Sequence, residues 1–239
     1  MLSDISKESI LFSIIKILES HKINYWITDG TLLGIIRENR LLPWDSDIDI
    51  GVWKSEVSSL EIINMFEKEG FRYAETLPDM DCLYFFFQNT QIDIGLYSKD
   101  DREVSIKWAT NPKKTIDRLL VRMIALIFEN NKKTINFYIK SKYSVRNIFS
   151  SIFGALSYIL TNNIKEKMYS FARAKYLYLG CVYPAKLLRF KKILFRDQEI
   201  IVPLDSDEYL REQYGENWRT PTEEYVWEAM TPNLRVFRD

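Results

Sequence analysis

Histidine and cysteine are almost missing from this chain of 239 residues, which contains one histidine and two cysteines. Histidine is the base in most catalytic triads, and protein zinc sites combine several histidine or cysteine ligands. The composition therefore argues against histidine-based hydrolysis and against a zinc site. We expect His21 to lie at the end of the first helix, and Cys82 and Cys181 to be reduced and partly buried.

A long apolar segment is missing too. The most apolar run, residues 148–160, would extend about 20 Å as a helix, short of the roughly 30 Å hydrocarbon layer of a bilayer. The N-terminal sequence MLSDISKE is polar and acidic, unlike a signal peptide. These features predict a cytoplasmic protein. The 148–160 run is expected to be a core helix, with peripheral contact at the inner face of an anionic membrane as the alternative.

Net charge is zero, but the charges are unevenly distributed. Residues 1–100 carry 9 lysines and arginines against 17 acidic residues, whereas residues 101–200 carry 20 against 7. An acidic first part suits a metal site, and a basic middle suits an anionic substrate or membrane surface. The basic residues lack the aromatic-basic pattern of nucleic-acid recognition, so no nucleic-acid partner is expected.

The apolar periodicity predicts an α+β fold with a mixed sheet. Helices are expected over 5–20, 31–37 and 55–69, and strands over 24–28, 47–52, 71–75, 83–88, 91–97 and 104–109. Further helices are expected over 113–129, 144–160, 163–178 and 207–214, with a hairpin over 192–202. We therefore predict one domain over residues 1–239, with a catalytic sheet core (1–110) and a mainly helical part (111–239) that packs on the sheet and ends in a closing tail.

Three aspartates alternate along one predicted strand, in the sequence WDSDIDIG that begins at Trp44. Residues two apart on a strand share a face, so Asp45, Asp47 and Asp49 should point to one side. Like charges about 4 Å apart repel by roughly 4 kcal/mol at an effective dielectric constant of 20, so the site needs a cation. Oxygen ligands favour a hard ion, which predicts Mg²⁺, with Mn²⁺ as the alternative.

The order of these motifs resembles the nucleotidyltransferase superfamily, in which a Gly-Ser/Thr turn and a short helix precede an Asp-x-Asp strand. More narrowly, residues 25–37 (YWITDGTLLGIIR) and 42–51 (LPWDSDIDIG) are similar to the signature of the LicD family. That family includes bacterial phosphocholine transferases and the domain shared by fukutin and fukutin-related protein. Residues 209–221 (YLREQYGENWRTP) resemble its closing element.

This resemblance implies a transferase that moves choline, ribitol or glycerol phosphate from a CDP-linked donor to a sugar hydroxyl and releases CMP. The acceptor would be a precursor of bacterial capsule, lipopolysaccharide or teichoic acid, including a lipid-linked one. Asp47 and Asp49 would be catalytic metal ligands, and Asp93, expected mid-strand, would be the third ligand, the base, or both. Its alternative is a paired carboxylate at a strand edge. Asp45 is either a further ligand or a carboxylate behind the ligands.

Substrate contacts are expected from the turn and the helix that follows it. Gly30 would let the backbone approach a phosphate, and the amide and hydroxyl of Thr31 would donate to that phosphate. Arg37 would pair with phosphate, or else form an ion pair near Glu38 or with Asp45.

Two tryptophans complete the predicted substrate site. Trp44 either packs its loop or stacks on a base, and Trp218, with Tyr214, either closes the pocket or packs the tail on the core. Asp29 and Arg40 stand where the family pattern has a small residue and a glycine, which leaves the identity of the donor open.

Two other functions remain open from sequence alone. The first is a general nucleotidyltransferase that transfers a nucleotide from a nucleoside triphosphate and releases pyrophosphate. The second is a catalytically silent scaffold with the same fold, against which the three aspartates Asp47, Asp49 and Asp93 argue.

Overall fold

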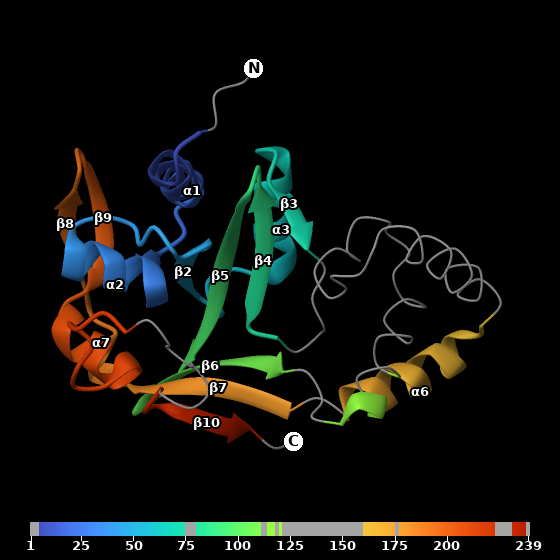
Figure 1. The fold of residues 1–239 in the computed structure, drawn as a ribbon. Helices are drawn as coiled ribbons and strands as arrows, with labels where there is room; N and C mark the ends of the chain where they lie inside the picture. Colours follow the sequence, from blue (N-terminus) through green and yellow to red (C-terminus); the bar gives the residue numbers. More distant parts are fainter. Residues whose placement is uncertain are drawn as a thin grey trace. The chain divides into compact units, whose positions relative to one another are not determined.

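The computed structural model describes residues 5–74, 80–110, 114–117, 120, 160–174, 177–222 and 231–237. It divides the chain into two units, which we describe separately: Met1–Trp108 with Leu179–Arg235, and Ala109–Tyr178 with Val236–Asp239. Figure 1 traces the elements along the chain. The second unit contains the helix α6 (Asn162–Arg173).

The first unit is built on a mixed sheet whose strands come from distant parts of the sequence. Its helices are α1 (Lys7–Ser20), α2 (Asp29–Glu38), α3 (Ser59–Lys68) and α7 (Ser206–Tyr214), with a 3₁₀ turn at Ala185–Leu187. The strands are β1 (Tyr25–Ile27), β2 (Asp47–Trp53), β3 (Arg72–Ala74), β4 (Cys82–Phe87), β5 (Thr90–Lys99), β6 (Glu103–Thr110), β7 (Leu177–Pro184), β8 (Phe190–Phe195), β9 (Gln198–Pro203) and β10 (Leu234–Phe237).

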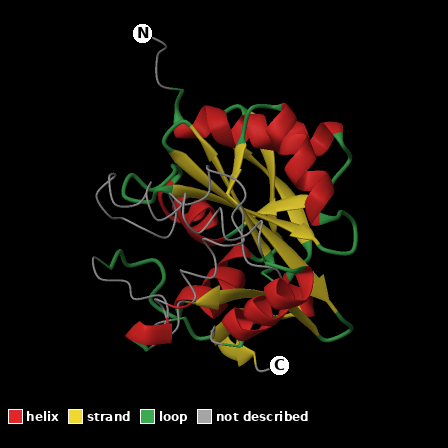
Figure 2. Cartoon of the chain, turned by 90° about the vertical axis from the view of Figure 1, so that its right-hand side faces the viewer, coloured by secondary structure: helices red, strands yellow, loops and turns green. Residues whose placement is uncertain are grey.

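Among the described residues, eight strands form one sheet in the order β1-β2-β5-β6-β7-β10, with β4 on β5 and β3 on β4. β8 and β9 form a separate hairpin. Figure 2 shows these strands in yellow, with helices lying beside them. β2 and β5 are parallel, whereas β1 with β2 and β4 with β5 are antiparallel. The predicted α+β class with a mixed sheet is confirmed.

The pairing of β2 with β5 divides their side chains between two faces. Ile48 lies opposite Ile92 in register, and Asp49 lies opposite Asp93. Because side chains alternate along a strand, the isoleucines share one face and the aspartates share the other. The parallel register therefore collects the acidic side chains of two strands on a single face of the sheet.

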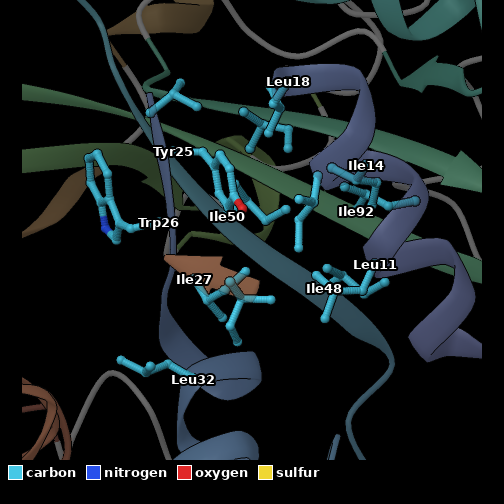
Figure 3. Close-up of a cluster of buried hydrophobic side chains, with 14 of the residues drawn as sticks. Leu11, Ile14, Leu18, Tyr25, Trp26, Ile27, Leu32, Ile48, Ile50 and Ile92 are labelled. Carbon is cyan, nitrogen blue, oxygen red and sulfur yellow. The ribbon is translucent and has the colours of Figure 1, made fainter. Parts of the chain in front are cut away.

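The isoleucine face is covered by α1. Figure 3 shows Leu11, Ile14 and Leu18 of this helix pointing toward Ile48 and Ile50, and all five are buried. Burying each such side chain contributes roughly 1.5–3 kcal/mol relative to leaving it in water. This packing anchors β2 from behind and leaves its acidic face to the site.

The opposite face is packed with aromatic rings beyond the aspartates. Trp26 of β1 is fully buried, and its ring centroid lies 4.7 Å from that of Trp53 and 5.0 Å from that of Tyr97. A Cβ atom on Gly51 would collide with the Trp26 indole. Glycine is therefore required where β2 passes this ring.

Several predictions for the first part of the chain are confirmed, with shifted ends. Ser6 is the N-cap of α1, and its side chain accepts a hydrogen bond from the Ser9 amide (3.1 Å). α3 begins with a capping box between Ser58 and Glu61. His21 is the C-cap of α1, and its Nδ1 lies 2.9 Å from the Ile17 carbonyl oxygen. Both cysteines are free and buried.

The C-terminal part differs from its prediction. The helix predicted over 163–178 ends at Arg173, and β7 begins at Leu177. β7 and β10 were not predicted, and the hairpin is longer than expected, because β8 starts at Phe190. Residues 111–239 therefore contribute four strands, so the described portion of this part is not mainly helical.

Two predictions fall largely outside the described residues. These are the helices over 113–129 and 144–160, of which only residues 114–117, 120 and 160 are described. Organisation as one domain also stays a prediction. No helix in the described ranges has both the length and the hydropathy required to cross a membrane.

Candidate active site

A pocket of about 720 Å³ opens on the acidic face of the first unit. Its acidic wall consists of Asp29, Asp45, Asp47, Asp49 and Asp93. Its aromatic wall consists of Trp44, Tyr84, Tyr97, Trp108, Tyr183, Tyr214 and Trp218. A cavity of this size, with a few convergent polar groups on one side, has the form of a small-molecule site.

Three of these carboxylates form a compact group. One oxygen each from Asp45, Asp47 and Asp49 lies within 4.8 Å of the others. Asp47 and Asp49 are on the open face of β2, and Asp45 is in the loop before it. The predicted convergence of the three side chains is confirmed.

The turn at the start of α2 lies directly against this group. The Thr31 amide and hydroxyl donate to Asp49 Oδ2 (3.1 and 3.3 Å), and the Asp49 amide donates to Thr31 Oγ1 (2.8 Å). A Cβ atom on Gly30 would collide with Asp45 Oδ2, so any larger residue here would displace the Asp45 carboxylate. Thr31 was predicted to donate to phosphate, but in this structure both of its donors orient Asp49. Phosphate binding by Gly30 and Thr31 stays a prediction.

The close packing of negative charge changes the acidity of the group. Burial and the negative charge of Asp47 raise the pKa of Asp29 to about 7. Burial, with a hydrogen bond and the charge of Asp47, likewise raises the pKa of Asp45 to about 7. Burial and neighbouring carboxylates raise the pKa of Asp49 and of Asp93 well above the usual range. Such shifts arise when like charges share a poorly solvated site.

This acidic wall fits a divalent metal ion. In the described part of the chain, none of the five carboxylates forms an ion pair with lysine or arginine, and Lys7 instead donates to the Asp45 backbone carbonyl (3.2 Å). All candidate ligand atoms are carboxylate oxygens, which suit a hard cation. Asp45, Asp47 and Asp49 are therefore the residues that could hold a metal ion.

Asp93 lies in the same pocket but outside this group of three. Asp93 is on β5, opposite Asp49 of β2 and opposite Tyr84 of β4. Its Oδ1 accepts a hydrogen bond from Gln91 Nε2 (2.8 Å). Asp93 was proposed as a ligand, a base, or both, and these roles stay predictions.

Arg37 and Trp218 were both predicted substrate contacts, and they contact each other. Arg37 forms an ion pair with Glu38 (2.8 Å), which is the alternative considered from sequence, and Arg37 Nη1 donates to the Trp218 carbonyl (3.3 Å). Trp218 is 5% exposed and lines the pocket, and the Arg219 guanidinium lies 4.4 Å from its ring centroid. The segment that contains Trp218 therefore contacts α2 and also forms one side of the pocket.

Trp44 has a different environment. Its side chain is 65% exposed at the pocket, so it does not pack its own loop into the core. An exposed indole beside a pocket can stack on a ligand ring. Base stacking by Trp44 stays a prediction.

Sequence reasoning missed several pocket residues. Asp29 was treated only as a departure from a family pattern, although it forms part of the acidic wall and accepts a hydrogen bond from Gln213. The sequence feature that could have identified Asp29 was its position directly before Gly30. Tyr183 comes from the unpredicted strand β7, and therefore carried no signal.

Removing the Thr31 hydroxyl should destabilise the fold locally. Thr31→Val keeps the volume but leaves the Asp49 amide without its acceptor, which should lower the free energy of unfolding by about 1–3 kcal/mol. Thr31→Ser keeps the hydroxyl and serves as the control. Urea unfolding of both variants tests this, and equal stability of Thr31→Val and wild type would contradict the role given to this hydrogen bond.

The first part of the site matches a known protein family. Residues 22–84 match the family model described as LicD/FKTN/FKRP, nucleotidyltransferase domain. This segment of the chain is similar to the LicD family. The match includes the turn at Gly30 and the three aspartates of the acidic group, and it ends before Asp93. The resemblance predicted from the motifs is confirmed.

The relatives of this chain differ in how much of their sequence they share with it. The lipopolysaccharide cholinephosphotransferase LicD of Haemophilus influenzae is 25% identical over 86% of each chain. The ribitol 5-phosphate transferase FKRP of Mus musculus is 35% identical over 35% of this chain, and an uncharacterised protein of Rickettsia typhi is 30% identical over 41%. Those two matches cover only 18% and 30% of the relatives' own lengths.

Among solved structures, the lincosamide antibiotic adenylyltransferase LnuA with lincomycin bound is similar to this chain. The similarity covers 86% of this chain and 85% of that chain, with 12% identity and a TM-score of 0.44.

Proposed function

We propose that this LicD-family chain is a Mg²⁺-dependent transferase that moves a phospho-alcohol from a CDP-linked donor to a sugar hydroxyl of a bacterial surface glycan, releasing CMP. The observation that carries the proposal is the group formed by Asp45, Asp47 and Asp49, whose oxygens lie within 4.8 Å of one another beside a glycine turn. Magnesium held there would neutralise charge on the donor diphosphate. The names of the H. influenzae and mouse relatives support choline or ribitol phosphate as the transferred group.

The reaction requires one bond to form and one to break. The acceptor oxygen bonds to the phosphorus of the alcohol phosphate, and the bond from that phosphorus to the CMP oxygen breaks. The hydroxyl proton needs an acceptor, and the chain has no histidine in this pocket. We assign this role to Asp93, because it lines the pocket outside the group of three carboxylates.

Donor and acceptor have distinct places in the proposed complex. The diphosphate would lie near Gly30 and the carboxylates, and Trp44 would stack on the cytosine base. The aromatic wall beside Trp218 would hold the alcohol or the acceptor sugar. Contact with an anionic membrane or a lipid-linked acceptor stays a prediction, supported by the basic composition of residues 101–200. A cytoplasmic location also stays a prediction.

Ligand screening followed by product analysis tests the function. CDP-choline, CDP-ribitol, CDP-glycerol and nucleoside triphosphates would each be added with Mg²⁺, and the unfolding temperature measured. A true donor should raise that temperature by mass action. At a donor concentration of 100 times its Kd, the free energy of unfolding should rise by about 2.7 kcal/mol. CMP release from one CDP-alcohol is expected. Pyrophosphate release from a triphosphate would instead establish a general nucleotidyltransferase, and binding of none of these ligands would support a silent scaffold.

A further inference from the structure

Helix α7 contacts the active-site turn through two fully buried side chains. Tyr209 and Gln213 are four residues apart, so they lie on one face of the helix. The Tyr209 hydroxyl lies 2.6 Å from Thr28 Oγ1, and Gln213 Nε2 donates to Asp29 Oδ1. Thr28 and Asp29 are the two residues that directly precede Gly30.

The contacted residues hold an unfavourable backbone conformation. Asp29 has φ +47°, in the left-handed region that residues other than glycine seldom occupy. Such a conformation persists only where surrounding contacts impose it. Thr28 is the N-cap of α2 but makes no capping hydrogen bond with its side chain. Its hydroxyl is used by Tyr209 and by Tyr97 (3.3 Å) instead.

The same turn is bonded to the metal-binding strand. The Thr28 amide donates to the Asp49 carbonyl (3.3 Å), and the Thr31 amide and hydroxyl donate to the Asp49 carboxylate (3.1 and 3.3 Å). The turn at residues 28–31 therefore connects α7 on one side with Asp49 on the other. A shift of α7 would change the direction of the Asp49 carboxylate without touching it.

The position of α7 is itself tied to the pocket. The Tyr209 ring stacks on that of Tyr183, with centroids 4.8 Å apart and planes 7° apart, and Tyr183 lines the pocket. At its C-terminal end, α7 leads through Gly215 to Trp218, whose carbonyl accepts a hydrogen bond from Arg37 of α2. A ligand against this wall would therefore contact the element that holds the turn.

We propose that Tyr209 and Gln213 are positioning residues that hold the turn at residues 28–31 and so orient Asp49 for metal binding. The metal-binding half of this inference rests on the proposed function, whereas the positioning half depends on the hydrogen bonds alone. Neither side chain needs to touch the metal or the substrate. Their loss should weaken metal binding while the core of α1 and β2 stays intact.

The test compares Tyr209→Phe and Gln213→Met with Tyr25→Phe. Tyr209→Phe removes one hydroxyl and keeps the ring on Tyr183. Tyr25→Phe is the matched control, because Tyr25 is also a buried tyrosine (2% exposed), its hydroxyl donates to Glu19 (3.4 Å), and it points to the α1 face (Figure 3). Each protein is measured by amide hydrogen exchange and by Mg²⁺ titration.

Both test variants should release the turn locally. Exchange of the Thr31 amide is expected to become about fivefold faster, the factor that corresponds to one lost hydrogen bond. The Ile14 amide in α1 should exchange at the wild-type rate. Mg²⁺ affinity should fall about 10-fold or more, as it does when residues that orient metal ligands are removed. Tyr25→Phe should change neither Thr31 exchange nor Mg²⁺ affinity.

Four outcomes separate the possible failures. Unchanged Thr31 exchange in both test variants would overturn the positioning role, and so would equal acceleration at Thr31 and Ile14, which indicates global destabilisation. Faster Thr31 exchange with unchanged Mg²⁺ affinity would overturn the link to Asp49. Faster Thr31 exchange in a protein whose wild type binds no Mg²⁺ would support the positioning role and overturn the proposed metal dependence.

Discussion

Replacing Asp47 by asparagine should reduce phospho-alcohol transfer by at least about 100-fold, because stabilisation of transition-state charge by a bound metal ion amounts to several kcal/mol. Asp47 lies between Asp45 and Asp49 in the acidic group, and its charge raises the pKa of Asp29, Asp45, Asp49 and Asp93. Without metal, the variant should be at least as stable as wild type, since a repulsive charge is removed. CMP release and urea unfolding in EDTA measure the two effects.

Asp197→Asn is the matched control for this prediction. Asp197 lies exposed in the turn between β8 and β9, so the control also removes one negative charge but leaves the pocket unchanged. Its activity and stability should equal those of wild type. Wild-type turnover by Asp47→Asn would remove Asp47 from the metal site. A large loss of stability in EDTA would show that its charge supports the fold instead of opposing it.

Without metal, the free energy of unfolding should fall as the pH rises from about 5 to 8. The pKa values of Asp29 and Asp45 are raised to about 7 in the folded protein, whereas unfolded aspartate titrates near 3.9. The folded state therefore binds protons more readily, and the stability it gains from them is present at low pH. That stability is lost as the pH rises through about 7. Urea unfolding in EDTA at several pH values measures the slope.

Magnesium should reverse this dependence, because the metal binds the deprotonated carboxylates. Asp47→Asn should flatten the slope in EDTA, since it removes the charge that raises the neighbouring pKa values. His21→Gln provides the control for the one histidine of the chain. Stability that rises with pH in EDTA would contradict the proposed electrostatics of the site.

The strand β2 was predictable from sequence because its information is local. Asp47 and Asp49 alternate with isoleucines, and period two fixes both the strand and its polar face. The glycine turn was equally visible, but its hydrogen bonds to Asp49 were not. Thr31 has two donors, and sequence does not reveal that Asp49 accepts both of them.

The opposite wall of the pocket depends on contacts that have no local pattern. Asp29 accepts its hydrogen bond from Gln213, which is 184 residues away. The left-handed backbone conformation of Asp29 cannot be predicted from the spacing of apolar residues. The first two residues of β7 were assigned to the helix predicted over 163–178 and the others to no element, because the sequence LYLGCVYP is an apolar run without strict alternation. Tyr183 was missed for that reason.

The bond between Tyr209 and Thr28 also bears on how the protein is made. Asp49 leaves the ribosome 160 residues before Tyr209, which at 5–20 residues per second corresponds to roughly 8–30 s of synthesis. A nascent chain therefore carries its clustered carboxylates before the helix that holds their turn exists. Joining residues 181 positions apart closes one of the longest loops of the chain, and such closures slow folding. We expect β2 and β5 to pair early, and the completed site to await the synthesis of α7.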